Sequence, residues 1–320
     1  MREAIAGLAD QLRWSAALEV PRAERASEVL VCAVGGSMYA GEAAGIVAAE
    51  DGLLVHLHRG YGLPKWAFER RPHVIAVTYS GNTEETNSSL DQASELGLPI
   101  SIVSSGGRAT ERAGDSGWST VTVPAGLPPR VAAGFQIGSV LRLLESIAGL
   151  PDSRSALEAA AEVVDRQMVD AAPLADDLAD ALEHHLPVIM GGNGVGAVGA
   201  VRWKTQINEN SKLPAFAVQI PEANHNDLEG WGGGSPGRLA LVALHDVDEH
   251  PRVRLRLTKT MADLAGTVIT AGNVHARGVG PLARLFSLTV VGDLVSVALA
   301  EQRGVDPFPI DRLERFKETL

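Results

Sequence analysis

Short apolar runs alternate with helical segments along this chain, and this alternation restricts its fold more than any other feature. The runs of the first half lie at residues 29–34, 53–57, 74–78, 100–103 and 119–123. Short, mostly apolar runs bounded by turn residues are typical of strands that are covered on both faces. Strands joined through helices pair in parallel. The sequence therefore predicts an α/β fold built on parallel sheets.

The same order of elements returns in the second half of the chain. Residues 153–183 are rich in Ala, Leu, Asp and Glu and predict linking helices, broken near Pro173. Beyond them we expect a helix at 197–211 and strands at 187–190, 216–220, 239–244 and 266–270. VCAVGGS at 31–37 and VIMGGNG at 188–194 both place a glycine pair after a strand. We therefore expect two related domains, 1–152 and 153–320.

Composition excludes several classes of protein. The formal net charge of −11 argues against nucleic acid as the main partner, because such binding needs a lysine and arginine surface. The only cysteine, Cys32, cannot form an internal disulfide, which favours a reducing compartment. The apolar stretch at 288–300 is interrupted by Asp293 and is too short to cross a bilayer of roughly 30 Å. The charged N-terminus does not resemble a signal sequence, and we expect a soluble, cytoplasmic protein with no membrane partner.

The first glycine turn is a candidate anion site. Gly35 and Gly36 leave the main chain bare, so that amides at the start of the next helix can approach an anion, and Ser37 adds a hydroxyl. Close packing between a strand and a helix accounts for such a glycine pair equally well. The motif alone leaves both interpretations open.

The loop TYSGNTEET at 78–86 is more specific, because it concentrates hydroxyl groups at the end of a predicted strand. We expect Gly81 to allow an unusual turn and Thr83 to cap a helix that begins near Glu84. A capping box needs only Thr83 and Thr86 and is the simpler explanation. The loop offers more hydroxyls than a cap uses, and it predicts an anion site formed by Thr78, Ser80, Thr83 and Thr86.

Several motifs together resemble a known family. TYSGNTEET is similar to the loop of sugar isomerase (SIS) domains, which bind phosphosugars. Four further segments narrow the match, namely GLPPR at 126–130, RWKTQINENSK at 202–212, PEANHNDLEGW at 221–231 and DPFPIDRLERFK at 306–317. Their combination resembles the bifunctional phosphoglucose/phosphomannose isomerase family over nearly the whole chain. The resemblance implies two tandem SIS-type three-layer αβα domains, with the phosphate-binding loops in the first and the catalytic Glu and His segments and a C-terminal helix in the second.

The resemblance also implies an activity and assigns residues to it. The family interconverts fructose 6-phosphate with glucose 6-phosphate, mannose 6-phosphate or both, by proton transfer through an enediol. Glu209 corresponds to the base that moves the proton and His225 to the group that opens the sugar ring, tasks that suit a carboxylate and an imidazole. Arg130 supplies fixed positive charge for the enediol. Lys317 corresponds to a lysine that assists ring opening or binds a substrate hydroxyl.

The residues around these positions allow simpler roles. Glu209 is spaced to pair with Lys212 on a helix surface, although asparagine on both sides of it is unusual in a helix unless the amides have work to do. Asn224 and Asn226 are placed to fix the ring of His225. Lys317 on its own is typical of a solvated chain end.

The resemblance implies a homodimer in which His225 reaches the site of the neighbouring subunit, and a small sugar phosphate as the ligand. We expect no cofactor and no metal site, because His56 and His58 alternate on a strand and His184 and His185 are adjacent. A non-catalytic phosphosugar-binding regulator, and an enzyme for another phosphosugar such as an aminated hexose, are the alternatives. In the family, acceptance of both glucose 6-phosphate and mannose 6-phosphate is associated with a threonine near the C-terminal lysine. No threonine lies between Gln302 and Lys317, so the use of both epimers stays open.

Overall fold

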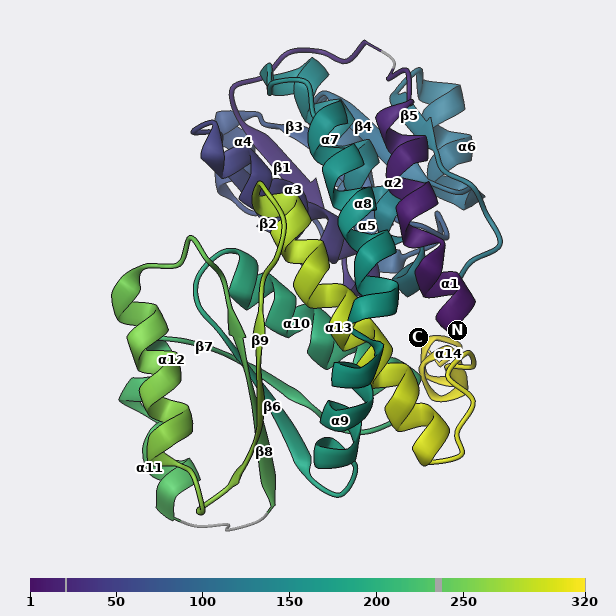
Figure 1. Cartoon of the computed structure of the whole chain (residues 1–320). Helices are drawn as coiled ribbons and strands as arrows, with labels where there is room; N and C mark the ends of the chain where they lie inside the picture. The colour runs from purple at the N-terminus through teal and green to yellow at the C-terminus, as the bar shows by residue number, and fades with distance from the viewer. Residues whose placement is uncertain (21, 234–237, 320) are drawn as a thin grey trace. The chain divides into compact units, whose positions relative to one another are not determined.

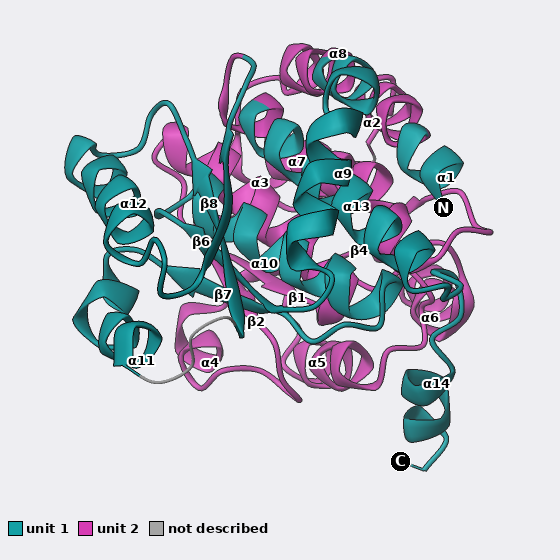
Figure 2. Cartoon of the chain, turned by 60° about the horizontal axis from the view of Figure 1, so that its bottom comes forward, with its two compact units in different colours: residues 1–6, 163–278, 284–320 teal, residues 7–162, 279–283 magenta. Residues whose placement is uncertain are grey.

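A computed structural model gives the fold and describes residues 1–20, 22–233 and 238–319. Its contacts divide the chain into two compact units (Figure 2). Unit 2 comprises residues 7–162 and 279–283, and unit 1 comprises residues 1–6, 163–278 and 284–320. The division of the chain into domains at 152/153 stays a prediction.

The sheet of unit 2 contains the predicted strands of the first half. Its order is β2 (Val55–His58), β1 (Val29–Cys32), β3 (His73–Val77), β4 (Ile100–Ser104) and β5 (Ser119–Thr122). Every neighbouring pair among these described strands is parallel, as predicted. Each strand lies within two residues of its predicted run. The mixed α/β architecture with parallel sheets is therefore confirmed.

Helices cover both faces of this sheet, which gives three layers (Figure 1). One face buries Leu30, Cys32, Val74 and Ile102 beneath α4 (Trp66–Arg70), α5 (Glu84–Glu95) and α6 (Gly107–Ser116). The other face lies beneath α3 (Met38–Glu50) and α7 (Ala133–Ala148), with α2 (Leu8–Ala16) packed on α7. Gly41 of α3 lies so close to Val31 that an added Cβ would approach its Cγ1 to 2.9 Å.

The sheet of unit 1 has the order β7 (Phe216–Gln219), β6 (Leu186–Gly191), β8 (Leu239–His245) and β9 (Ile269–His275), again parallel throughout its described strands. Strand β9 differs most from its prediction, because it begins three residues later than expected and continues to His275. Its sequence ITAGNVH contains small and polar residues that resemble a turn, and its partner β8 shifts register between Leu241 and Val242.

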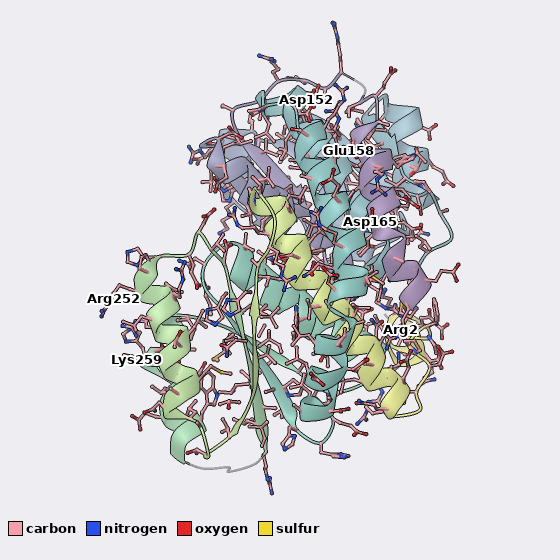
Figure 3. All side chains as sticks on the ribbon, viewed as in Figure 1. Arg2, Asp152, Glu158, Asp165, Arg252 and Lys259 are labelled. Atoms are coloured by element: carbon pink, nitrogen blue, oxygen red, sulfur yellow. The ribbon has the colours of Figure 1, made fainter. Side chains whose placement is uncertain are left out.

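Helices cover both faces of this second sheet as well. On one face α11 (Asp227–Gly233) and α12 (Pro251–Asp263) enclose the core residues Trp231, Leu257 and Met261. Figure 3 shows Arg252 and Lys259 of α12 pointing away from that sheet. The other face carries α9 (Ala172–Leu182) and α10 (Val195–Asn210). The predicted break in the linking helices lies between α8 (Arg154–Asp170) and α9, with Pro173 in the first turn of α9.

Helix α13 (Pro281–Gln302) is longer than the apolar stretch predicted from the sequence. By length and composition it is the one helix of the described chain able to cross a membrane, yet its apolar window is entirely buried inside the protein, as in a core helix. Asp293, which interrupts that stretch, binds Arg202 of α10 through two hydrogen bonds of 3.1 and 3.0 Å. Both side chains are only 2% exposed. The pair attaches α13 to the helix that carries Glu209.

A neutral histidine lies in the sheet of unit 2. His73 is 1% exposed, its Nδ1 lies 2.9 Å from the carbonyl oxygen of Glu24, and its Nε2 lies 2.8 Å from Ser101 Oγ. Because a carbonyl only accepts, Nδ1 carries the proton and Nε2 accepts from the serine hydroxyl. Burial removes the water that would solvate a charged ring and lowers the pKa of His73 to about 4.

We expect His73 to weaken the fold in acid. As the pH falls below 6.5, the unfolded chain binds a proton here that the folded chain takes up only near pH 4, so the free energy of unfolding decreases across this window. The loss between pH 7 and pH 4.5 should be about 2 to 3 kcal/mol. Urea unfolding of wild type and His73→Gln at both pH values measures it. Equal pH dependence in the two proteins would contradict the assignment.

Candidate functional site

The carboxyl edge of the unit 2 sheet gathers the residues predicted to bind an anion. Strand β1 lies between β2 and β3, so the loops after β1 and β3 leave the sheet at the position where ligands bind in open parallel sheets. The turn η1 (Gly35–Ser37) follows β1, and the loop from Thr78 follows β3. The N–H of Tyr79 donates to Ser37 Oγ at 3.4 Å. The structure therefore brings the two predicted loops together.

The two glycines of the first turn differ in backbone conformation and in surroundings. Gly35 has φ of 57°, in the left-handed region, and an added Cβ would meet nothing within 4 Å. A Cβ at Gly36 would lie 3.5 Å from both N and Cα of Arg130, in the turn η2 (Pro129–Val131). Arg130 is only 2% exposed. These are ordinary van der Waals distances, so the main chain of the predicted arginine lies against the first turn without requiring glycine at position 36.

The second loop does not form the capping box that was its simpler explanation. Helix α5 begins at Glu84 as predicted, but Thr83 makes no side-chain cap within the described structure. Its Oγ1 instead accepts a hydrogen bond of 2.9 Å from Thr78 Oγ1. Thr83 was therefore wrongly predicted as a side-chain cap, because the neighbouring threonine competes for its hydroxyl.

Thr86 lies just after this loop, in the first turn of α5. The residue is 1% exposed, and its Oγ1 is buried with no hydrogen-bond partner among the described residues. Buried hydroxyls are normally paired, since an unpaired one loses its hydration without compensation. Ser80, at the exposed end of the loop, accepts a hydrogen bond from the N–H of Asn82 at 3.2 Å. Thr86 therefore carries a buried hydroxyl for which the described residues supply no hydrogen-bond partner.

Gly81 allows the unusual turn that was expected, but sequence reasoning missed the loop that packs against it. Gly81 has φ of 71°, and a Cβ there would lie 1.8 Å from the carbonyl oxygen of Gly106. A Cβ at Gly107 would lie 2.4 Å from the carbonyl oxygen of Ser80. The loops after β3 and β4 therefore pack main chain on main chain. The only available signal was the second glycine pair, SSGG at 104–107.

Asn87 is a second residue that was missed. Its Nδ2 donates to the carbonyl oxygens of Gly81 and Thr83 at 3.1 and 2.9 Å. The residue is 4% exposed, so these bonds are shielded from water. A cavity of about 320 Å³ adjoins this side of α5 and is lined by Tyr61, Asn82, Glu84, Asn87, Ser88, Asp91 and Arg108. The cavity lies beside the loop but is not lined by the predicted threonines.

Glu209 lies in unit 1, in the last turn of α10, and is partly buried. The side-chain amides of the two flanking asparagines both form hydrogen bonds, as their position in a helix suggested. Asn208 Oδ1 accepts from the N–H of Ala215 at 2.9 Å, and Asn210 Nδ2 donates to Ser296 Oγ of α13 at 2.9 Å. Lys212 Nζ donates to the main-chain oxygen of Glu209. The end of α10 is therefore held on both sides of the predicted base.

His225 ends the short turn η3 (Glu222–His225) and is exposed. The expectation that neighbouring amides fix its ring was wrong. Asn224 Nδ2 donates to Thr260 Oγ1 at 2.8 Å, and Asn226 Nδ2 donates to Glu222 Oε1 at 3.3 Å. The amides hold the main chain before and after the histidine, and the ring projects from that support.

Lys317 is the last residue of α14 (Asp311–Lys317), a helix whose residues are all exposed. The segment before α14 is attached to the end of α10. Lys212 Nζ donates to the carbonyl oxygen of Pro309 at 2.7 Å, and Arg303 Nε donates to that of Ser211 at 3.1 Å. Unit 1 thus brings the approach to the Lys317 helix next to the chain that follows Glu209.

The predicted site residues divide between the two units. Unit 2 holds the hydroxyl loops and Arg130, which suit an oxyanion, while unit 1 holds Glu209, His225 and Lys317, which can move protons or donate to oxygen. The described residues contain no group of three His, Cys, Asp or Glu side chains that could hold a metal ion.

Comparison with known proteins agrees with the motifs. Residues 172–320 match the model of the bacterial phospho-glucose isomerase C-terminal SIS domain. Among solved structures, hypothetical protein TT0462 from Thermus thermophilus superposes with a TM-score of 0.77 at 16% identity, over 99% of this chain and 89% of that one. That likeness shows the shared fold.

Two curated relatives are similar over most of their length. The chain is 34% identical to the bifunctional phosphoglucose/phosphomannose isomerase of Aquifex aeolicus, over 82% of this chain and 80% of that protein. It is 32% identical to the protein of the same name from Caldicellulosiruptor bescii, over 93% and 91% of the two chains. The chain therefore belongs to the bifunctional phosphoglucose/phosphomannose isomerase family.

Proposed function

We propose that this protein is an aldose-ketose isomerase that interconverts fructose 6-phosphate with glucose 6-phosphate, mannose 6-phosphate or both. The observation that carries the proposal is the hydroxyl loop of unit 2, followed by the buried Thr86 Oγ1, which has no hydrogen-bond partner among the described residues. Membership of the isomerase family supports it further. A phosphate group accepts hydrogen bonds only, so it suits a loop of hydroxyls and main-chain amides.

The phosphate of the substrate is proposed to bind where the loops after β1 and β3 meet. The N–H groups of Gly36 and Ser37 and the hydroxyls of Ser80, Thr83 and Thr86 are its proposed donors, with Gly35 setting the turn and Thr78 orienting the Thr83 hydroxyl. Such contacts hold the end of the sugar remote from the reacting carbons. Binding energy from this remote group then serves to orient C1 and C2.

The proton is proposed to move between C2 and C1 on the carboxylate of Glu209. His225 donates a proton to the ring oxygen as the sugar opens, and Lys317 assists at that oxygen or at a neighbouring hydroxyl. The enediol that forms between the two proton transfers concentrates negative charge on oxygen, and the guanidinium of Arg130 stabilises it because it stays charged at all working pH values.

His225 is proposed to act in the site of a second subunit, within a homodimer. Its exposure supports this, since the ring projects from a well-supported turn instead of packing within its own chain. We further propose that the enzyme works in the cytoplasm without cofactor or metal. The regulator hypothesis, in which sugar phosphate binds without turnover, is the alternative that the following experiments separate.

Thr86→Val should weaken substrate binding without weakening the fold. The substitution keeps the shape and removes a hydroxyl that has no partner among the described residues, so the free energy of unfolding should be unchanged or higher. One lost hydrogen bond to a charged phosphate should raise KM for fructose 6-phosphate by about tenfold. Thr258→Val, at an exposed helical threonine, is the matched control. A wild-type KM in Thr86→Val would place the phosphate elsewhere.

Glu209→Gln tests the base. The amide keeps the size of the side chain and cannot accept a proton, so kcat should fall by about 10³ while sugar phosphate still binds. A coupled assay measures turnover from fructose 6-phosphate, and calorimetry measures binding. Glu50→Gln, at the last residue of α3, should behave as wild type. Binding without turnover in the wild-type protein would support the regulator hypothesis, and full turnover in Glu209→Gln would remove Glu209 from the mechanism.

Mixed dimers test the origin of the histidine. If His225 serves the neighbouring site, a dimer of one Glu209→Gln subunit and one His225→Ala subunit contains one site with both wild-type residues. Coexpressed at equal amounts, the two inactive variants should recover about a quarter of wild-type activity, since half of the dimers are mixed and each has one complete site of two. Residual activity no higher than that of the two pure variants would show that the histidine acts in its own subunit.

A further inference from the structure

We infer that Tyr79 is a positioning residue that holds the segment carrying Arg130 against the phosphate-binding loops. The inference concerns unit 2 alone and rests on the proposed function for the role of Arg130. Tyr79 is the second residue of TYSGNTEET, and its neighbours were assigned to the anion while it was not.

The side chain of Tyr79 spans from the β3 loop to the segment after β5. Its hydroxyl donates to the carbonyl oxygen of Pro124 at 2.9 Å and accepts from the N–H of Leu127 at 3.2 Å. The residue is only 6% exposed. Burial raises the pKa of the phenol, although the Leu127 N–H acts in the opposite direction. The group therefore keeps its proton and can donate and accept at the same time.

The main chain of Tyr79 joins two more loops. Its N–H donates to Ser37 Oγ after β1, and its carbonyl oxygen accepts from the N–H and the Oγ of Ser105 after β4 at 2.9 and 2.6 Å. With the hydroxyl contacts to the segment after β5, one residue connects the loops that follow β1, β3, β4 and β5. The main-chain contacts do not require the hydroxyl. Removing the hydroxyl should therefore affect only the contacts with the segment after β5.

The segment 124–130 depends on that hydroxyl at one end. Around Arg130 itself, Gln136 Nε2 donates to the carbonyl oxygen of Pro129 at 3.0 Å, and Gln11 Nε2 donates to that of Val131 at 2.7 Å. On the near side, Gly126 has φ of 99° and an added Cβ would meet nothing within 4 Å. The two tyrosine hydrogen bonds flank this glycine, at Pro124 and Leu127. Without them the chain that leads through Pro128 and Pro129 to Arg130 would lose both of these bonds to the β3 loop.

This arrangement predicts a separation of kinetic parameters. The phosphate donors stay in place when the hydroxyl is removed, because Ser37 and Ser105 bind the main chain of Tyr79. Arg130 loses its exact position relative to the reacting oxygen, and a displacement of about 1 Å can cost up to about 100-fold in rate. Tyr79→Phe should therefore lower kcat by about 10- to 100-fold and leave KM for fructose 6-phosphate within about twofold.

The decisive experiment is a double-mutant cycle with an independent structural measurement. Wild type, Tyr79→Phe, Arg130→Lys and the double variant are assayed, with Tyr61→Phe as the matched control because that tyrosine is 56% exposed. If Tyr79 acts through Arg130, its substitution should change kcat much less in the Arg130→Lys background than in wild type. Amide hydrogen exchange should show faster exchange in residues 124–131 of Tyr79→Phe, including the Leu127 N–H, and no change there in Tyr61→Phe.

The outcomes distinguish this inference from the proposed function. Unchanged exchange at Leu127 in Tyr79→Phe overturns the inference, whether or not the enzyme is active. Wild-type kcat in Tyr79→Phe, or effects of the two substitutions that multiply, overturns it as well. A wild-type protein without isomerase activity overturns the proposed function, while faster exchange in residues 124–131 would still support the positioning contact. Loss of kcat through general unfolding would appear as faster exchange throughout unit 2 and would also overturn the inference.

Discussion

The carboxyl edge of the unit 2 sheet depends on one steric constraint, the main-chain contact between the loops after β3 and β4. Gly81 and Gly107 each lie where any Cβ would overlap a carbonyl oxygen of the other loop, at 1.8 and 2.4 Å. This contact fixes the Ser80 to Thr83 turn, in which Thr83 accepts a hydrogen bond from Thr78. Asn87 bonds the same turn from beneath. The hydroxyls are thus presented by a support that contains almost no flexible side chain.

The glycine pair occurs in both units, but the structural requirement for glycine differs between them. In unit 1 a Cβ at Gly191 would lie 2.1 Å from the carbonyl oxygen of Gly196, and one at Gly192 would lie 2.7 Å from Val253 Cγ1. Packing explains both. Gly35 in unit 2 has no such neighbour and is required by its left-handed backbone. The carboxyl edge of unit 1 also carries Asp246 and Asp248, both paired with Arg284, and acidic groups would repel a phosphate.

The fold was largely predictable because it depends on local patterns. Buried parallel strands are apolar on both faces, so eight of the described strands lie close to their predicted runs, while β9, with its small and polar residues, was misplaced. The site was predictable only where the motif itself carries the chemistry. Tyr79, Asn87 and Gly107 act through contacts between loops that are distant in sequence. No spacing rule shows that a tyrosine hydroxyl will bind Pro124, or that the amides beside His225 will bind Thr260 and Glu222 instead of the imidazole.

The buried pair of Arg202 and Asp293 restricts which amino-acid substitutions this enzyme can accept. Each side chain is 2% exposed, and losing either partner would leave an isolated charge in the interior at a cost of about 3 to 5 kcal/mol. The two positions must therefore mutate together or not at all. Because Arg202 belongs to α10, which carries Glu209 in its last turn, this coupling also restricts sequence change in that helix. Anyone grafting that helix into another scaffold would have to transfer a large part of α13 with it.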